Sequence, residues 1–315
     1  MAKPAKTVSD PVNEARAAAA AMLAGEGPAP RITRTQTDGE VVKFCLATTD
    51  GYEIESVVVP MGAEVAGCDR TWRTLCVSCQ IGCGHACRFC QTARMGLFRD
   101  LTAAEIVGQV RAARETLGAE VRNVVFMGMG EPLDNLDQVL GAIEALHGDP
   151  RRQIPRRRIT VSTVGRCAGI RRLAALRWRR LNLAVSLNAP NDEIRGRLMP
   201  INRVEPMAAL REAIAAYPVR AGGHVLIEYV LIKGLNDAPQ HAGELADYLR
   251  GLRTCVNLIP FNPFPGSGWQ PAEETTVDQF QAILMAAGQM AFRRNTKGRQ
   301  AMAACGQLGG RPRPA

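Results

Sequence analysis

The chain has 315 residues, of which 46% are hydrophobic and 22% are charged, so it can bury a large core and can form two domains or one barrel. No apolar run approaches the ~20 residues that a membrane helix needs, which argues against an integral membrane protein. The first 25 residues lack the continuous apolar stretch of a secretory signal. We therefore expect a cytoplasmic protein.

The formal charge is +9 and the pI is near 9.3, which favours a polyanionic partner such as nucleic acid. Arginine makes up 34 of the 39 basic residues, so a general arginine bias of the genome is an alternative explanation. The distribution of charge favours a binding surface, because residues 151–180 contain eleven arginines and no acidic residue. We expect this segment to contact RNA or phosphate.

The N-terminal part of the chain predicts little regular structure. Residues 1–30 are rich in Ala, Pro and Gly, which indicates a mobile arm with at most one or two helical turns. Alternating apolar residues at 41–46 and 54–59, separated by the turn-like TTDG, predict a β-hairpin. The expected divisions are an arm at 1–30, a hairpin extension at 31–70, a core at 71–300 and a C-terminal segment at 301–315.

Within the core, strands alternate with helical segments, which is the pattern of parallel βα units. We expect six strands, at 75–78, 123–127, 158–163, 181–187, 224–231 and 255–260. Helices are expected at 101–117, which opens with a capping box at Thr102 and Glu105, at 136–147 and at 277–290. Six units are fewer than the eight of a closed barrel, so the predicted fold class is α/β with a partial (β/α)6 barrel. The site should lie at the carboxyl ends of the strands.

Ten cysteines in a cytoplasmic chain with a large core are not expected to form a disulfide framework. Five of them lie within residues 76–90, which indicates metal or redox chemistry. Cys83, Cys87 and Cys90 place three thiolates within eight residues, which suits one face of an iron–sulfur cluster with one iron left open. A zinc site is the alternative, and its fourth ligand would be Cys76, Cys79 or His85.

The C-x3-C-x2-C spacing, with Phe89 before the last cysteine, resembles the cluster loop of the radical S-adenosylmethionine superfamily. Longer motifs narrow the resemblance to the RlmN/Cfr family of RNA adenosine methyltransferases. They are LCVSCQIGC at 75–83, FMGMGEPLDN at 126–135, ITVST at 159–163, SLNAPNDEIR at 186–195, NLIPFNPFPG at 257–266 and AACGQL at 303–308. The motifs follow the family's order over residues 40–310, so the resemblance predicts the partial TIM-like barrel of that superfamily.

The resemblance implies a 4Fe-4S cluster held by Cys83, Cys87 and Cys90. In such enzymes the open iron binds S-adenosylmethionine, and an electron from a donor such as flavodoxin or ferredoxin splits it to a 5'-deoxyadenosyl radical. The amino group of the cofactor is assigned to Gly130 and Glu131, whose carboxylate can accept from an ammonium. The implied contacts to its ribose, carboxylate or adenine are Ser162, Ser186, Leu187, Asn188 and Asn262.

The resemblance also implies a methyl carrier. Cys305 matches the cysteine that one S-adenosylmethionine methylates, and a radical formed from a second molecule removes a hydrogen from that S-methyl group. The carbon radical adds to adenine, Glu55 takes the ring proton, and Cys76 releases the product by forming a disulfide with Cys305. The cysteines that match no functional position, and that we expect to be buried, are Cys45, Cys68, Cys167 and Cys255.

The sequence departs from the family at several places. Asn188 stands where histidine is expected, Cys79 replaces an expected serine and adds a thiol near the cluster, and the segment 61–74 is longer than usual. The Ala/Pro arm stands in place of the family's compact N-terminal RNA-binding domain. The basic segments 151–180 and 293–299, together with the arm, would therefore carry more of the RNA binding.

The implied activity is methylation of an adenosine at C2 in 23S ribosomal RNA, with transfer RNA as a further substrate, by a monomeric enzyme. Three alternatives stay open. They are C8 methylation, a radical enzyme that acts on a small molecule or peptide, and a zinc-dependent RNA-binding module without catalysis. We expect charge reversal at Arg156, Arg157 and Arg158 to weaken RNA binding while cofactor cleavage survives.

Overall fold

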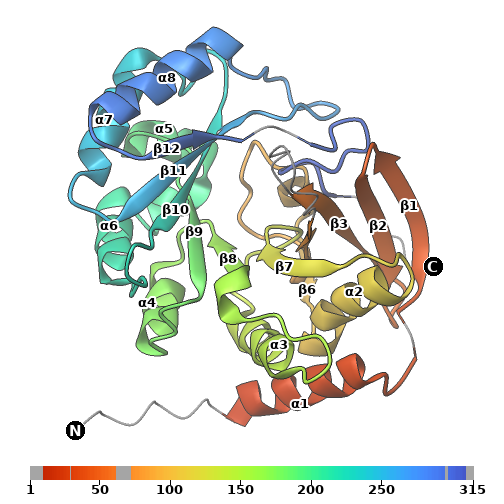
Figure 1. The fold of residues 1–315 in the computed structure, drawn as a ribbon. Helices are drawn as coiled ribbons and strands as arrows, with labels where there is room; N and C mark the ends of the chain where they lie inside the picture. The colour runs from red at the N-terminus through yellow and green to blue at the C-terminus, as the bar shows by residue number, and fades with distance from the viewer. Residues whose placement is uncertain (1–9, 29, 62–71, 295–296, 310–315) are drawn as a thin grey trace, which may run out of the picture.

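The computed structural model describes residues 10–28, 30–61, 72–294 and 297–309. Its centre is a ten-stranded sheet that curls into an open barrel with helices on its outer face (Figure 1). The strands, in their order across the sheet, are β1 (Ile32–Asp38), β2 (Val41–Ala47), β3 (Glu53–Met61), β4 (Trp72–Cys76), β7 (Val121–Phe126), β8 (Ile159–Thr163), β9 (Asn182–Ser186), β10 (Val225–Leu231), β11 (Thr254–Pro260) and β12 (Ala291–Arg293).

Neighbouring strands are antiparallel from β1 to β4 and parallel from β4 to β12. Among the described residues, the two edge strands β1 and β12 do not pair with each other, so the barrel is partial, as predicted. A separate two-stranded sheet consists of β5 (Gln80–Gly82) and β6 (Leu97–Asp100).

Helices connect the parallel strands. The α-helices are α1 (Asp10–Ala24), α2 (Ala103–Glu115), α3 (Leu136–Gly148), α4 (Cys167–Ala175), α5 (Asp192–Leu198), α6 (Met207–Ala216), α7 (Pro239–Leu249) and α8 (Glu274–Ala286). Three 3-10 turns are η1 (Thr92–Met95), η2 (Arg156–Arg158) and η3 (Pro200–Arg203). No helix in the described ranges is long and apolar enough to cross a membrane.

All six predicted parallel strands are present, with ends that differ from the prediction by at most three residues. The capping box at the start of α2 is also confirmed, because the Thr102 hydroxyl accepts from the Glu105 amide and the Glu105 carboxylate accepts from the Thr102 amide. The prediction missed a seventh parallel strand, β12, which is only three residues long and lies in a basic stretch without an apolar pattern.

The prediction of at most two helical turns in residues 1–30 was wrong, because α1 is a 15-residue helix. It buries Val12, Ala15 and Ala19 along one side and packs against α2 and α3. At the contact with α3, a Cβ on Gly141 would lie 2.5 Å from the Cβ of Ala15, so the two helices approach through small residues. The alanine-rich composition hid this narrow apolar stripe.

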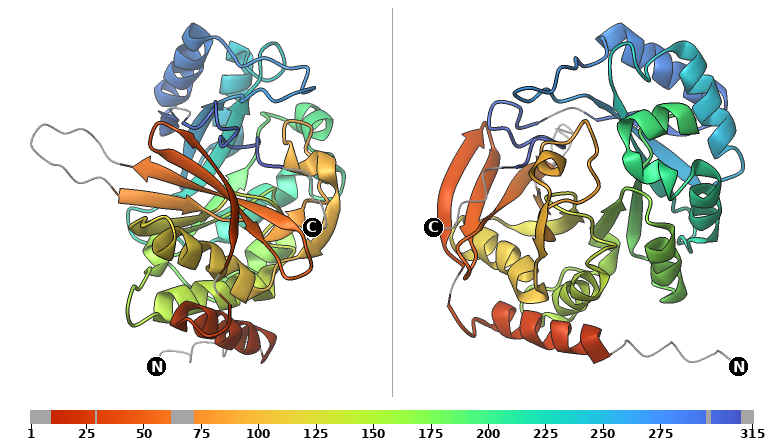
Figure 2. Two further views of the ribbon diagram at one scale, coloured as in Figure 1. Left: turned by 90° about the vertical axis from the view of Figure 1, so that its right-hand side faces the viewer. Right: turned by 180° about the vertical axis from the view of Figure 1, so that it is seen from behind.

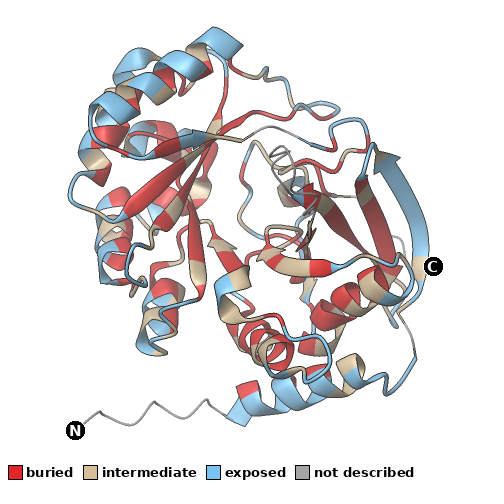
Figure 3. Ribbon diagram, in the orientation of Figure 1, coloured by how far each residue is buried: buried red, intermediate tan, exposed pale blue. Residues whose placement is uncertain are grey.

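The predicted hairpin is confirmed as β2 and β3, but it is not a separate extension. β1 precedes it, and β3 pairs with β4, so the three N-terminal strands continue the main sheet (Figure 2). Burial follows this arrangement, since β2 and β3 are largely buried whereas β1 is an exposed edge strand (Figure 3).

Candidate active site

The loop that carries Cys83, Cys87 and Cys90 is held between β5 and β6. The loop lies after the first parallel strand, β4, and β5 fixes its start. The Cys83 amide donates to the carbonyl of Gly96 (2.8 Å), and the Arg88 amide donates to the carbonyl of Leu198 (3.0 Å). The three free thiols line one wall of a small cavity of about 140 Å³ at the carboxyl ends of the strands.

These cysteines fit an iron–sulfur cluster. Burial raises the pKa of the Cys83 thiol to about 12, and it also raises the pKa of Cys87 and Cys90. Thiols with raised pKa values become thiolates only beside a strong positive charge, which a bound cluster would supply. Among the described residues, no three His, Cys, Asp or Glu side chains are grouped to hold one metal ion, and this includes the three cysteines of the loop.

The small cavity brings together most of the residues that the resemblance assigns to the cofactor. Besides the three cysteines, its lining includes Gly130, Glu131, Ser162, Ser186, Asn188, Asn262 and Cys305. Leu187 is the exception, because its side chain is fully buried in the main hydrophobic core. Apart from Cys305, which lies on the C-terminal segment, these residues lie at or after the ends of four parallel strands, β7, β8, β9 and β11, and the parallel register of the sheet places them on one rim.

The Gly130–Glu131 segment is fixed by the chain itself. Gly130 has a φ of +102°, and a Cβ there would lie 2.6 Å from the Cβ of Gln80, so glycine is required. The buried Glu131 carboxylate accepts from the amides of Leu133 (3.0 Å) and Val164 (2.8 Å). Burial outweighs these hydrogen bonds and raises the pKa of Glu131 to about 7.

Asn188 has a structural reason to stand where histidine was expected. Its φ is +57°, a left-handed conformation that asparagine adopts more readily than most residues. Its side-chain oxygen accepts from the amide of Val230 (2.9 Å), and its carbonyl accepts from the side chain of Asn236 (2.8 Å). The residue therefore holds its rim position through this chain's own hydrogen bonds.

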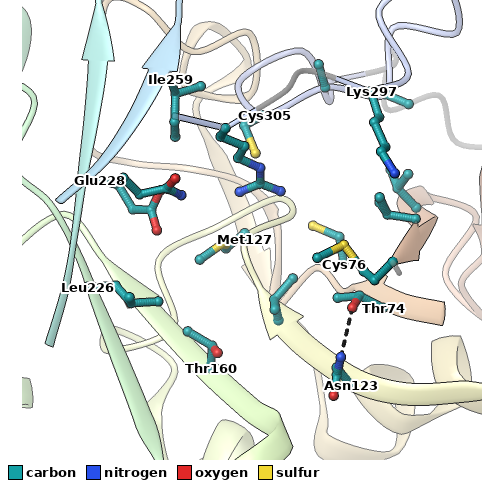
Figure 4. Close-up of a pocket in the computed structure, with 18 of the residues that line it drawn as sticks. Thr74, Cys76, Asn123, Met127, Thr160, Leu226, Glu228, Ile259, Lys297 and Cys305 are labelled. Carbon is teal, nitrogen blue, oxygen red and sulfur yellow. Dashed lines mark hydrogen bonds between the residues drawn. The ribbon is translucent and has the colours of Figure 1, made fainter. Parts of the chain in front are cut away.

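A second, larger cavity of about 610 Å³ lies inside the barrel (Figure 4). Cys76, at the end of β4, and Cys305, on the C-terminal segment, both line it. Cys305 also lines the small cavity, so it stands at the junction between the two. Both cysteines are free thiols. Burial, and then the nearby charge of Cys305, raise the pKa of Cys76 to about 12.

Hydrogen bonds fasten the segment that carries Cys305. The side chain of Asn262 donates to the carbonyl of Cys305 (3.2 Å), and that of Gln307 donates to the carbonyl of Pro263 (2.7 Å). The amide of Gln91, beside the cluster loop, donates to the carbonyl of Gly306 (2.7 Å). The segment is thus tied both to the end of β11 and to the cluster loop, which sets the place of the thiol.

Glu55 lies apart from both cavities, although the resemblance assigns it the ring proton. Its carboxylate accepts from the amide of Gly309 (3.0 Å) and lies 3.5 Å from the Lys43 ammonium. In this conformation Glu55 anchors the C-terminal segment to β3. Its role as proton acceptor stays a prediction.

The remaining cysteines behave largely as expected. Cys45, Cys167 and Cys255 are buried, whereas Cys68 lies outside the described residues, as does most of the long 61–74 segment. Cys79 is also buried and lines neither cavity, because its thiol donates to the carbonyl of Met129 (3.6 Å).

The basic run at the start of β8 divides into two parts. Arg157 and Arg158 line the larger cavity, and neither forms an ion pair with a described acidic residue. Arg156 pairs instead with Glu144, and its guanidinium lies 4.3 Å from the ring centroid of Trp178. Arg156 is therefore engaged within the chain, and RNA contact at the three arginines stays a prediction.

Sequence reasoning missed Glu228 in the larger cavity, whereas Arg294, which also lines it, belongs to the predicted basic segment 293–299. Glu228 is an acid in the middle of the otherwise apolar strand VLIEYVL, and this break in the pattern could have revealed it. The pKa of Arg294 is raised, first by the charge of the nearby Cys305 and then by the charges of Glu228 and Cys76.

Comparison with known proteins agrees with this geometry. The family model of the Radical SAM superfamily, whose members use a 4Fe-4S cluster and S-adenosylmethionine, matches residues 77–247. A probable dual-specificity RNA methyltransferase RlmN of Protochlamydia amoebophila is 46% identical over 88% of this chain and 75% of its own length. A dual-specificity RNA methyltransferase RlmN of Phenylobacterium zucineum is 42% identical over 96% of this chain and 78% of its own length.

A crystal structure of a radical SAM methyltransferase from Sphaerobacter thermophilus is 43% identical, with a TM-score of 0.80 over 89% of this chain and 81% of that one. The superfamily match covers the cluster loop, and the relatives extend the likeness over most of the described sheet. The chain therefore belongs to the radical SAM superfamily and, within it, to the RlmN/Cfr family of RNA methyltransferases.

Proposed function

We propose that this chain methylates C2 of an adenosine in 23S ribosomal RNA, with transfer RNA as a second substrate, through a methyl group carried on Cys305. The observation that carries the proposal is the position of Cys305 at the junction of the two cavities. A methyl carrier must meet the cofactor on one side and the base on the other. The relatives named as dual-specificity RNA methyltransferases support RNA as the substrate class.

When bound at Cys83, Cys87 and Cys90, the cluster and its cofactor would supply a 5'-deoxyadenosyl radical once an electron arrives from a donor such as flavodoxin or ferredoxin. The chain's own residues carry the methyl group to the base. The Cys305 sulfur takes a methyl group by displacement at S-adenosylmethionine, and loss of one hydrogen from that methyl leaves a carbon radical that adds to C2.

Release of the product needs a second thiol. The adduct joins Cys305 to the base through a thioether carbon. The Cys76 sulfur attacks the Cys305 sulfur, so that a disulfide forms, the bond from that sulfur to the carbon breaks with its electron pair, and the carbon takes a proton to become the new methyl group. The one electron left over from the radical addition must also leave the adduct, with a bound cluster as its acceptor. Both thiols line the larger cavity, which supports this pairing. Glu55 is the residue that the resemblance names for the ring proton.

RNA would enter from the side of the larger cavity. Basic residues dominate its charged lining, namely Arg157, Arg158, Arg293, Arg294 and Lys297. Phosphate contacts from such side chains supply most of the affinity of an RNA-binding surface. A target base reaches a thiol inside the cavity only after it leaves its stack, and a cavity of about 610 Å³ has room for it.

The test is expression in a host that lacks its own family member, with a Cys305→Ala variant as control. Methyladenosine isomers are measured by mass spectrometry in separately purified ribosomal and transfer RNA. Cys305-dependent 2-methyladenosine in ribosomal RNA confirms the proposal, and 8-methyladenosine assigns the chain the other regiochemistry. Neither isomer, from protein that holds iron and cleaves S-adenosylmethionine, indicates a different substrate.

A further inference from the structure

The junction between the two cavities is the place where a methyl group on Cys305 meets its target. Five residues line both cavities, namely Met127, Glu228, Ile259, Asn262 and Cys305. Met127 and Ile259 are apolar. The side chain of Asn262 is already engaged, because its amide donates to the Cys305 carbonyl (3.2 Å) and its oxygen accepts from Arg299 (3.4 Å). Besides the methyl carrier, Glu228 is the remaining polar side chain at this point.

Glu228 holds one carboxylate oxygen unpaired. It lies in the middle of β10, beside Asn257 of β11 in the parallel register. The Asn257 amide donates to Oε2 (2.8 Å) and fixes the orientation of the carboxylate. Oε1 is buried and accepts no hydrogen bond from any described residue. A buried oxygen without a partner is costly, so a ligand that donates to it gains affinity.

Two opposing effects act on this carboxylate. Burial raises the pKa of Glu228, and the guanidinium of Arg294 opposes that rise. Figure 4 shows Glu228 and Cys76 on different walls of the cavity, so a base between these walls can contact both.

We propose that Glu228 selects the target base, because its free Oε1 accepts a hydrogen bond from the exocyclic amino group of an adenine placed against Cys305. This inference rests on the proposed function. The amino group and C2 of adenine flank N1 on the Watson–Crick edge, and enzymes that extrude a base read that edge by hydrogen bonds. One orientation of the ring therefore offers C2 to Cys305 and the amino donor to Glu228.

The competing partner for Oε1 is a hydroxyl of the cofactor, because Glu228 also lines the small cavity. Removal of the Glu228 carboxylate distinguishes the base from the cofactor as its partner. A base contact affects the choice between purines, whereas a cofactor contact affects binding of S-adenosylmethionine and its cleavage without RNA.

The experiment first maps the adenosine that the wild-type protein methylates in ribosomal RNA. Short RNAs around it are then synthesised with adenosine, purine riboside or N6-methyladenosine at that position. Purine riboside lacks the amino group, and N6-methyladenosine keeps one N–H. The kcat/KM of each RNA is measured for the wild type, Glu228→Met and Glu228→Gln. If no adenosine is methylated at all, the proposed function fails, and this inference fails with it.

The wild type is expected to prefer adenosine over purine riboside by roughly ten- to a hundredfold, the value of a hydrogen bond to a charged group. Glu228→Met keeps the length of the side chain but has no acceptor. It should bring the ratio of kcat/KM between the adenosine and purine riboside RNAs near one, mainly by lowering kcat/KM for the adenosine RNA. Glu228→Gln keeps one acceptor oxygen and should retain part of the preference. N6-methyladenosine should react better than purine riboside in the wild type.

Tyr229→Phe is the matched control on the same strand, since this side chain lies in the main hydrophobic core, against Phe280. It should keep the full preference. A Glu228→Met variant that still prefers adenosine overturns the proposal, and so does one that loses cofactor cleavage with the preference unchanged. If Glu228→Met does not fold, the wild-type series decides alone, because a wild type indifferent to the amino group also overturns the proposal.

Discussion

The two cavities that meet at Cys305 differ in how their polar groups are satisfied. In the small cavity, Glu131 accepts two backbone amides and Asn188 accepts a third, so these walls are rigid before any ligand arrives. In the larger cavity, Arg157 and Arg158 have no acidic partner among the described residues, and at its junction with the small cavity Glu228 keeps a free oxygen. The first arrangement suits one small ligand held in one pose, and the second suits a large anionic partner.

The largest effect should come from the wall of the small cavity. Cys87→Ala removes one of three thiolates, so the protein should lose its iron, its visible absorption and all methylation. Iron analysis and the RNA assay measure this. Cys255→Ala, at another buried free cysteine that lines neither of the two cavities, should keep iron and activity. Full iron in the Cys87→Ala protein would contradict the assignment of the loop.

The next effect concerns the larger cavity. Arg157→Glu combined with Arg158→Glu should weaken RNA binding at least about tenfold and reduce its salt dependence, while binding of S-adenosylmethionine stays unchanged. Arg156→Ala is the control, since this side chain is engaged by Glu144 and Trp178 and should change stability rather than affinity. Filter binding over a range of salt concentrations measures both. If the double variant and Arg156→Ala lose RNA affinity equally, the larger cavity is not the preferred RNA-binding surface.

The two cavities also differ in how far sequence could predict them. Short motifs placed Cys83, Cys87, Cys90, Gly130 and Glu131 correctly on the rim of the small cavity. Within each motif the spacing fixes the geometry over a few residues, and the alternation of strands and helices placed the motifs at the carboxyl ends of one sheet. The partial barrel followed from the same alternation.

The larger cavity could not be predicted in this way. Its walls combine interior positions of β3 and β10 with the C-terminal segment, and only the register of the whole sheet brings them together. The sequence shows that residues 156–158 are all basic. It does not show that Arg156 is engaged within the chain, because that depends on where Glu144 and Trp178 lie. Long-range contacts of this kind leave no local pattern in the sequence.

A pH experiment tests the small cavity, where the chain's own amides bind the buried Glu131 carboxylate. The ordinary pKa of a glutamate is near 4.5, and burial raises that of Glu131 to about 7. The folded state therefore binds a proton more tightly than the unfolded state. The stabilisation is complete below pH 4.5 and is lost as pH rises through about 7, a change of about 3 kcal/mol for a fully buried group.

The measurement is the free energy of unfolding from pH 4.5 to 8 without S-adenosylmethionine, for the wild type and Glu131→Gln. The variant should lose most of this slope, because its side chain does not titrate. It should also be less stable at low pH, since an amide has one acceptor oxygen for the two amides of Leu133 and Val164. Parallel pH profiles of the two proteins would rule out Glu131 as the titrating group.

The smallest effect tests whether the N-terminal helix belongs to either cavity. α1 packs against α2 and α3 on the outside of the sheet, so disturbing it should change stability and leave both cavities intact. Gly141→Ala places a Cβ 2.5 Å from the Cβ of Ala15 and should cost about 1–3 kcal/mol by overpacking. Gly148→Ala, at the last residue of the same helix, has open space around the new Cβ and should cost nothing. Thermal unfolding measures the difference, and RNA affinity measured on both proteins should stay equal. If Gly141→Ala loses RNA binding and Gly148→Ala does not, α1 is part of the RNA interface. The basic residues of the larger cavity would then form only one portion of that interface.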